Sequence, residues 1–234
     1  MNPEQERPLR RSNVLKRLTN LYDEPRYLEV GVGRGITFER VPAARKVAVD
    51  PVFRFDHEAK AREHPEATYH PVTSDEYFNR IIETDDVFDV IYLDGLHVYD
   101  QTLRDLLNAL EHLQPRGIIV IDDTRPPTYL ASLADRQLFF ELKRAIGSTE
   151  KQWMGDVYKT VYFIAAMCPH LSYATIANNH GQTVVWRTRR DETPEVSLDQ
   201  IDGLTFERFQ RAQEVLRLER FGDIRKRVRH DLGL

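Results

Sequence analysis

Four short runs of aliphatic and β-branched residues, each ending in Gly or Asp, constrain the fold of this sequence most. The runs span residues 26–31, 45–50, 88–95 and 117–123. Between the last two runs, leucines recur at the spacing of one helix face: Leu103, Leu106, Leu107, Leu110 and Leu113. A strand, a helix and a second strand in this order predict a parallel sheet covered by helices on both faces.

The segments around these runs predict further helices and a hairpin. Apolar spacing indicates helices over residues 12–22, 74–82, 133–147, 157–168 and 204–221. We expect Ser74 to cap the helix that begins there. Two strand-like runs flank the turn residues 178–181, so residues 171–187 predict a β-hairpin.

The 234 residues predict one domain with two appendages: an N-terminal helical segment (1–22), a central α/β domain (23–190) and a C-terminal helical tail (191–234). The tail contains a basic stretch, residues 217–230, for which a solvated helix face and a contact with an anionic partner both remain open. Its amphipathic helix would also suit a homodimer.

Composition excludes several classes of protein. No apolar run approaches the roughly 20 residues that span a bilayer, and no apolar segment begins the chain, so we expect a cytoplasmic protein without membrane contact. The net charge of -4 gives no electrostatic case for nucleic-acid binding. A single cysteine, Cys168, excludes an intramolecular disulfide and a cysteine-based metal cluster.

A glycine-rich loop, residues 29–35, lies where the first strand ends. Its glycines let backbone N–H groups approach a ligand closely. A dinucleotide fingerprint requires a third glycine at position 36, but that residue is Ile36, which argues against a nucleotide-binding oxidoreductase. Asp50 closes the second strand, where its carboxylate can accept hydrogen bonds from a ribose diol. Loop and acid predict a nucleoside-like ligand, with a purely structural turn as the alternative.

Acidic residues follow two further strands. Asp94 ends one strand, and Asp122 and Asp123 end the next strand in sequence. Neighbouring strands lie about 4.8 Å apart, so these carboxylates can converge at the C-terminal edge of the sheet. Three such anions repel one another unless a cation lies among them, and an all-oxygen set suits Mg²⁺, Ca²⁺ or Mn²⁺. The alternative is that the acids cap turns and helix ends.

These motifs carry a family resemblance. The segment E-V-G-V-G-R-G (29–35) followed by A-V-D (48–50) resembles class I S-adenosylmethionine-dependent methyltransferases. Residues 89–99 and 116–124 resemble the metal-dependent O-methyltransferases of the catechol type and of macrolide and aminocoumarin sugars. The resemblance covers residues 26–188. It implies a Rossmann-like methyltransferase fold with a seven-stranded, mostly parallel sheet, an antiparallel last strand and helices on both faces.

The resemblance also implies roles for particular residues. S-adenosylmethionine would be held by Glu29, Gly31, Gly33, Gly35 and Asp50, with Ser74 and Asp75 near its adenine. Asp94, Asp122 and Asp123 would bind a divalent ion, usually Mg²⁺. His97 would act as general base, held neutral by a helix N-terminus and the metal. Its alternative role is to orient the loop through hydrogen bonds.

The resulting expectation is metal-dependent O-methyl transfer to a hydroxyl of a small molecule, such as a sugar or a diol. A metal-independent methyltransferase, a nucleotide-binding oxidoreductase and a cofactor-binding module without chemistry are the alternatives. Trp153 is a candidate wall of the acceptor pocket, although a core or lid position explains this residue equally well.

Overall fold

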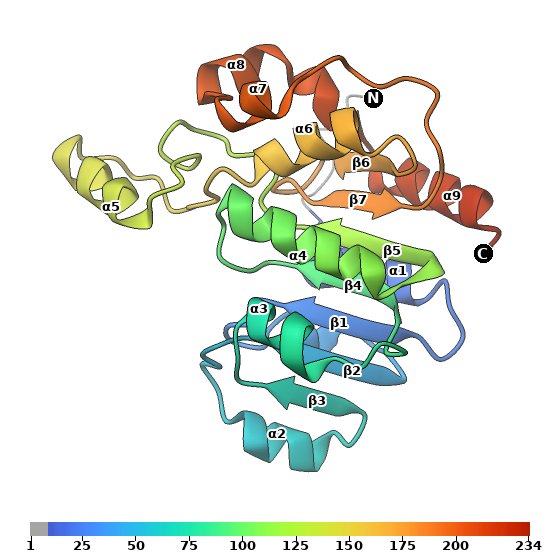
Figure 1. Cartoon of the computed structure of the whole chain (residues 1–234). Coiled ribbons are helices and arrows are strands. Elements are labelled where there is room, and N and C mark those ends of the chain that lie inside the picture. The colour runs from blue at the N-terminus through green and yellow to red at the C-terminus, as the bar shows by residue number, and fades with distance from the viewer. Residues whose placement is uncertain (1–8) are drawn as a thin grey trace.

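The computed structural model describes residues 9–234, so the first eight residues of the predicted N-terminal segment lie outside the described residues. One mixed sheet forms the centre of the molecule (Figure 1). Its strands are β1 (Arg26–Val30), β2 (Arg45–Val49), β3 (Ala67–His70), β4 (Phe88–Leu93), β5 (Leu113–Ile121), β6 (Ser172–Ile176), β7 (Thr183–Trp186) and β8 (Leu218–Glu219).

The strand order is β3-β2-β1-β4-β5-β7-β6-β8. The first five strands are parallel, and β7 runs antiparallel to both β5 and β6. This arrangement confirms the predicted Rossmann-like methyltransferase fold. A two-residue strand, β8, pairs in parallel with β6 and adds an eighth strand to the predicted seven.

Helices cover both faces of the sheet, as the sequence predicts. One face packs against α3 (Ser74–Glu76), η3 (Tyr77–Ile81), α4 (Tyr99–Glu111), α6 (Tyr158–Met167), α7 (Leu198–Asp202), α8 (Phe206–Arg211) and η4 (Gln213–Leu216). The other face packs against α1 (Arg11–Thr19), η2 (Phe38–Arg40) and α9 (Phe221–Leu232). Strand β5 supplies both cores, because Ile119 and Ile121 point to the first face and Ile118 and Val120 to the second.

Two helices lie at the periphery of the molecule. Helix α2 (His57–Glu63) precedes β3, and α5 (Arg136–Ala145) projects away from the sheet on the connection between β5 and α6 (Figure 1). Within the described chain, no helix has both the length and the apolar character to cross a membrane.

The predicted single helix over residues 204–221 is wrong. The chain instead forms α8, η4 and β8 before α9 begins. Ala212 leaves helical geometry, and Arg217 adopts a left-handed conformation with φ of 50°, which ends η4 and turns the chain into β8. The apolar residues keep a helix-like spacing across these breaks because each short element still buries one side against the sheet or its helices.

One further detail differs from the predictions. Thr73, rather than Ser74, caps α3: its side chain accepts a hydrogen bond from the Glu76 amide. In the tail, Phe221, Ile224 and Val228 of α9 are buried against the sheet, and both readings of the basic residues stay predictions.

Candidate active site

The site lies at the C-terminal edge of the parallel strands. Strands β1 and β4 are neighbours, and β5 follows on the other side of β4. Because successive connections leave β1 toward β2 and β4 toward β5, the loops after β1 and β4 open a crevice between them. A cavity of about 830 Å³ occupies this crevice. A smaller hollow of about 330 Å³ beside Arg10, Lys16 and Arg40 is lined by neither an acid nor a histidine.

The glycine loop forms one wall of the cavity and turns sharply. Gly31, Gly33 and Gly35 all have positive φ, a conformation in which other residues are strained. A Cβ on Gly31 would lie 1.9 Å from the carbonyl oxygen of Asp94, so glycine is required for the close approach of β1 and β4. A Cβ on Gly33 would meet nothing within 4 Å, which leaves the inner side of the loop open to the cavity.

Asp50 shapes this loop. One carboxylate oxygen accepts a hydrogen bond from the Gly33 amide at 2.8 Å, and the other accepts one from the Val52 amide at 2.7 Å. The side chain lines the cavity. Both of these hydrogen bonds join Asp50 to backbone amides of the chain. The contact of Asp50 with a ribose therefore stays a prediction.

Glu29 lies at the base of the cavity and is almost fully buried. The Tyr27 hydroxyl donates a hydrogen bond of 2.6 Å to its carboxylate. Burial raises the pKa of Glu29 to about 8, with a further contribution from the charge of Asp94. Glu29 is therefore mostly protonated at neutral pH.

Ser74 and Asp75 also line the cavity, at the end nearest β3. Gln101 of α4 donates from its side-chain nitrogen to the Ser74 hydroxyl at 3.2 Å and to Asp75 at 3.0 Å. Both residues therefore have partners within the chain, and their predicted contact with adenine remains untested.

The structure brings Asp94, Asp122 and Asp123 together, and we call these three side chains the carboxylate cluster. Register places Leu93 of β4 beside Ile121 of β5, so the residues that follow each strand meet at one level. Asp122 and Asp123 are buried. Asp94 lines the cavity, whereas Asp122 and Asp123 lie behind the cavity lining.

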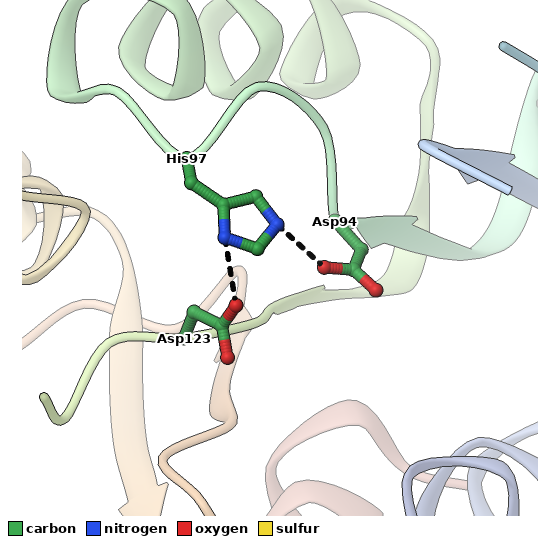
Figure 2. Close-up of side chains that lie close together, drawn as sticks. All are labelled: Asp94, His97 and Asp123. Carbon is green, nitrogen blue, oxygen red and sulfur yellow. Dashed lines mark ion pairs between the residues drawn. The ribbon is translucent and has the colours of Figure 1, made fainter. Parts of the chain in front are cut away.

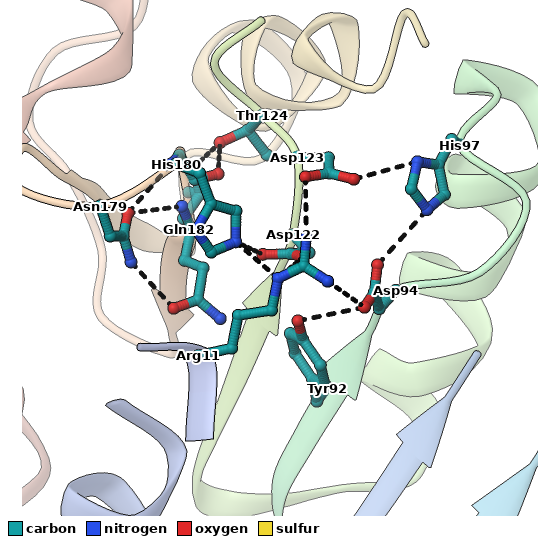
Figure 3. A network of polar contacts seen from close by, with 12 residues as sticks. Arg11, Tyr92, Asp94, His97, Asp122, Asp123, Thr124, Asn179, His180 and Gln182 are labelled. Atoms are coloured by element: carbon teal, nitrogen blue, oxygen red, sulfur yellow. Dashed lines mark hydrogen bonds and ion pairs between the residues drawn. The ribbon is translucent and has the colours of Figure 1, made fainter. Parts of the chain in front are cut away.

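A cation does lie among the acids, but it belongs to the protein. Arg11, the first residue of α1, contacts all three carboxylates (Figure 3). Its guanidinium lies 3.1 Å from Asp94, 2.8 Å from Asp122 and 3.3 Å from Asp123. These ion pairs offset the repulsion that the sequence predicts for the carboxylate cluster.

His97 bridges two of the acids (Figure 2). Its Nδ1 lies 3.0 Å from Asp123, and its Nε2 lies 3.4 Å from Asp94. Burial would lower the pKa of His97, but hydrogen bonds and charges of the two carboxylates raise it to about 11. The carboxylates therefore favour the protonated ring at neutral pH, and the neutral imidazole expected beside a bound metal stays a prediction. Asp94 and Asp123 cause this shift, so their neutralisation returns His97 toward the neutral form.

His180, on the turn between β6 and β7, completes the cluster. Its Nε2 lies 3.0 Å from Asp122 and 2.6 Å from Arg11 Nε. The turn is held against β5 because Thr124 donates a hydrogen bond to the Gly181 carbonyl from its amide and another from its hydroxyl. Burial opposes a positive charge on His180, yet Asp122 raises the pKa of the ring.

The buried acids respond in opposite directions to these contacts. Burial and the charge of Asp122 raise the pKa of Asp94 to about 6. Burial would raise the pKa of Asp122 as well, but His180 and Arg11 lower it below its usual value. Arg11 and the two histidines thus surround the carboxylate cluster with groups that stabilise its negative charge.

The cluster has the donor chemistry of a metal site. Donor atoms converge in two overlapping groups, Asp94 with His97 and Asp123, and Asp122 with Asp123 and His180, all within 4.8 Å of one another in each group. The donors thus include imidazole nitrogen, rather than the all-oxygen set expected from the sequence. Mn²⁺ accepts both ligand types, and Mg²⁺ prefers the carboxylates. The residues fit a divalent ion, provided that Arg11 leaves the carboxylates.

Trp153 forms the opposite wall beside His97. The indole and imidazole rings are nearly parallel, with centroids 5.3 Å apart and an interplanar angle of 7°. Arg136 of α5 lies 5.5 Å from the indole and also lines the cavity, together with Lys143 and Lys151. The prediction of Trp153 as a pocket wall is consistent with this position.

Sequence reasoning missed Arg11 and His180. Arg11 stands in an ordinary basic stretch, R-R-S-N, and His180 stands in a turn whose residues predict only a hairpin. Only the requirement for a cation among three acids pointed toward a further charged group, and it did not indicate which residue would supply the charge.

The comparison with known protein families matches the part of the chain that forms this edge of the sheet. Residues 28–124 match a family model described as a methyltransferase domain. Over this stretch the chain is similar to methyltransferase domains. The matched stretch includes the glycine loop, Asp94, His97, Asp122 and Asp123, but neither Arg11 nor His180. This match agrees with the resemblance drawn from the sequence.

Solved structures share the fold of this chain at low identity. The O-methyltransferase TomG from Streptomyces achromogenes, solved with S-adenosylmethionine, is 16% identical with a TM-score of 0.52, covering 76% of this chain and 79% of TomG. A Staphylococcus aureus protein, provisionally described as a caffeoyl-CoA O-methyltransferase, is 11% identical with a TM-score of 0.51, covering 75% of this chain and 82% of its own. No curated protein matches the sequence significantly.

Proposed function

We propose that this methyltransferase transfers the methyl group of S-adenosylmethionine to a hydroxyl oxygen of a small molecule, such as a sugar or a diol. One observation supports the proposal most: the glycine loop, Asp94 and His97 open into a single cavity. A cofactor held by the loop and an acceptor held near His97 would therefore share one enclosed space, and such positioning supplies much of the catalysis in a displacement reaction.

The cofactor side of the cavity would hold S-adenosylmethionine by its backbone and acids. Gly33 leaves room for the ligand against the loop, Gly31 lets the loop pass close to the Asp94 carbonyl, and Asp50 keeps the Gly33 amide in place. Glu29 would contact the ligand from the base of the cavity. Ser74 and Asp75 lie at the end of the cavity where the adenine is expected.

The acceptor side would hold the hydroxyl near the carboxylate cluster. Asp94 and Asp123 orient the His97 ring, which accepts the proton of the hydroxyl once its own proton has left. We propose Asp94, Asp122 and Asp123 as ligands of a divalent cation, preferably Mg²⁺. When bound, such an ion would lower the pKa of the acceptor hydroxyl. Trp153 would pack against the acceptor.

A metal-independent methyl transfer is the second candidate. Arg11 favours this reading, because its guanidinium already offsets the carboxylate cluster without a metal. In that case Arg11, rather than an ion, would hold the acceptor side in shape.

A two-stage experiment tests the proposal. S-adenosylhomocysteine should bind in isothermal titration calorimetry and stabilise the protein by roughly 2.7 kcal/mol at 100 times its Kd, whereas NAD should not. Methyl transfer from labelled S-adenosylmethionine should then reach catechols or hexoses in Mg²⁺ and stop in EDTA. Binding of NAD alone contradicts the cofactor, transfer to amines alone contradicts O-methylation, and full activity in EDTA selects the second candidate.

A further inference from the structure

Arg11 occupies the position in the carboxylate cluster that a metal ion would need. Its nitrogens lie within 3.3 Å of one oxygen from each acid. Figure 3 shows the side chain entering from α1 between Asp94, Asp122 and Asp123. The guanidinium and a cation therefore require the same oxygen lone pairs.

One buried oxygen of Asp122 has no hydrogen-bond partner in the described chain, which indicates that the cluster needs a cation. Asp122 Oδ2 is fully buried and accepts no hydrogen bond within the described chain. It lies 2.8 Å from Arg11 Nε. A buried carboxylate oxygen without a hydrogen bond is costly, so this atom depends on a cation in the cluster.

We propose that Arg11 is a tethered cation that competes directly with a divalent metal for the carboxylate cluster. Binding of the metal then requires the Arg11 side chain, with the first turn of α1, to withdraw. The inference deepens the proposed function, on which it rests for the identity of the metal site.

The surroundings of Arg11 allow this exchange. The side chain retains 36% of its exposure, so it reaches the cluster from the surface rather than from within the core. Val14, Leu15 and Leu18 anchor the rest of α1 in the core. Ahead of the helix, the Leu9 amide donates to the Asn178 carbonyl, which ties the strap formed by residues 9–11 to the turn that carries His180.

Charge balance makes the two cations exclusive. A divalent ion at these oxygens would lie within a few ångströms of the Arg11 guanidinium, and two cations so close repel each other strongly at a partly buried site. Withdrawal of Arg11 removes its repulsion with the divalent ion and frees one oxygen on each acid.

Terbium binding measures the competition without any methyl acceptor. Tb³⁺ binds carboxylate sites, and Tyr92, whose hydroxyl lies 3.3 Å from Asp94, can sensitise its luminescence. We expect Arg11→Met to bind Tb³⁺ and Mn²⁺ at least roughly tenfold more tightly than the wild type, since the metal no longer displaces charge-assisted hydrogen bonds. Arg17→Met is the matched control, because Arg17 is exposed on the same helix, and it should leave both affinities unchanged.

A second measurement needs no variant, in case Arg11→Met does not fold. Mn²⁺ added to the wild type should speed hydrogen exchange at the Leu9, Asn13 and Val14 amides at least severalfold, while the Leu18 amide stays protected. Equal metal affinities for wild type and Arg11→Met, or metal binding with unchanged exchange, overturn the proposal. Absence of metal binding in every variant also overturns it, while S-adenosylhomocysteine binding and turnover in EDTA would still support methyl transfer.

Discussion

The two sides of the cavity are built differently. The cofactor side is assembled from neighbours in sequence: the glycine loop, held by Asp50 only 17 positions from Gly33. The acceptor side is assembled from distant segments, since Arg11 and His180 meet across 169 positions. The first side is kept in shape by backbone geometry, and the second by charge balance among buried groups.

This difference determines how each side should respond to change. Backbone geometry fails when a side chain is added where none fits, and pH acts on this side through the buried acid Glu29. Charge balance fails when one charge is removed or replaced, and it responds to pH and to metal. The following predictions test this contrast, from the largest expected effect to the smallest.

The largest effect is expected at His97. Replacement by glutamine (His97→Gln) should lower kcat by about 10²–10⁴-fold, the usual contribution of a positioned general base. Binding of S-adenosylhomocysteine should remain within a few-fold. Steady-state kinetics and calorimetry measure the two. His170→Gln, a change at an exposed histidine after α6, is the control. Unchanged kcat in His97→Gln would exclude a role in proton transfer.

Paired glycine substitutions test the cofactor side. Gly31→Ala places a Cβ against the Asp94 carbonyl at 1.9 Å, so the loop must shift. We expect S-adenosylhomocysteine to bind about 100-fold more weakly, a loss of about 2.7 kcal/mol. Gly33→Ala meets no atom within 4 Å and should cost about 1–2 kcal/mol of stability through its left-handed conformation. Calorimetry measures the affinity for S-adenosylhomocysteine, and urea unfolding measures the stability. The same result for both variants would contradict the geometric argument.

Removal of Arg11 tests charge balance on the acceptor side. In the absence of metal, Arg11→Met should lower the free energy of unfolding by about 2–3 kcal/mol, because buried carboxylates lose their counter-ion. Mn²⁺ should recover most of this loss. Urea unfolding with and without the ion measures both effects, and Arg17→Met should change neither. Wild-type stability in Arg11→Met would mean that the histidines suffice to balance the acids.

The smallest effect concerns Glu29 and pH. Its pKa in the fold is about 8, above the ordinary 4.5, so the folded state holds more protons between these values. Stability contributed by the protonated acid is therefore lost as pH rises through that window. Glu29→Gln removes this titration, so its stability relative to the wild type should grow from pH 5 to pH 8. A difference that is constant with pH would show an ordinary pKa.

The sequence predicts the cofactor side almost completely and the acceptor side in part. Alternation of apolar runs indicates the strands, and Gly31, Gly33 and Asp50 mark the loop because local geometry restricts residue type there. Asp94, Asp122 and Asp123 were predicted to meet because parallel strands end at one edge. The identity of their partner was not predicted, since an arginine or histidine that pairs across the fold has no local signature.

Synthesis order gives the Arg11–His180 contact a consequence for folding. Residue 11 leaves the ribosome early and residue 180 late, so the acids of β4 and β5 emerge before His180 is available. Closing so long a loop costs entropy that only the finished contacts offset. The glycine loop can form with the first strands, whereas the carboxylate cluster becomes complete with the hairpin.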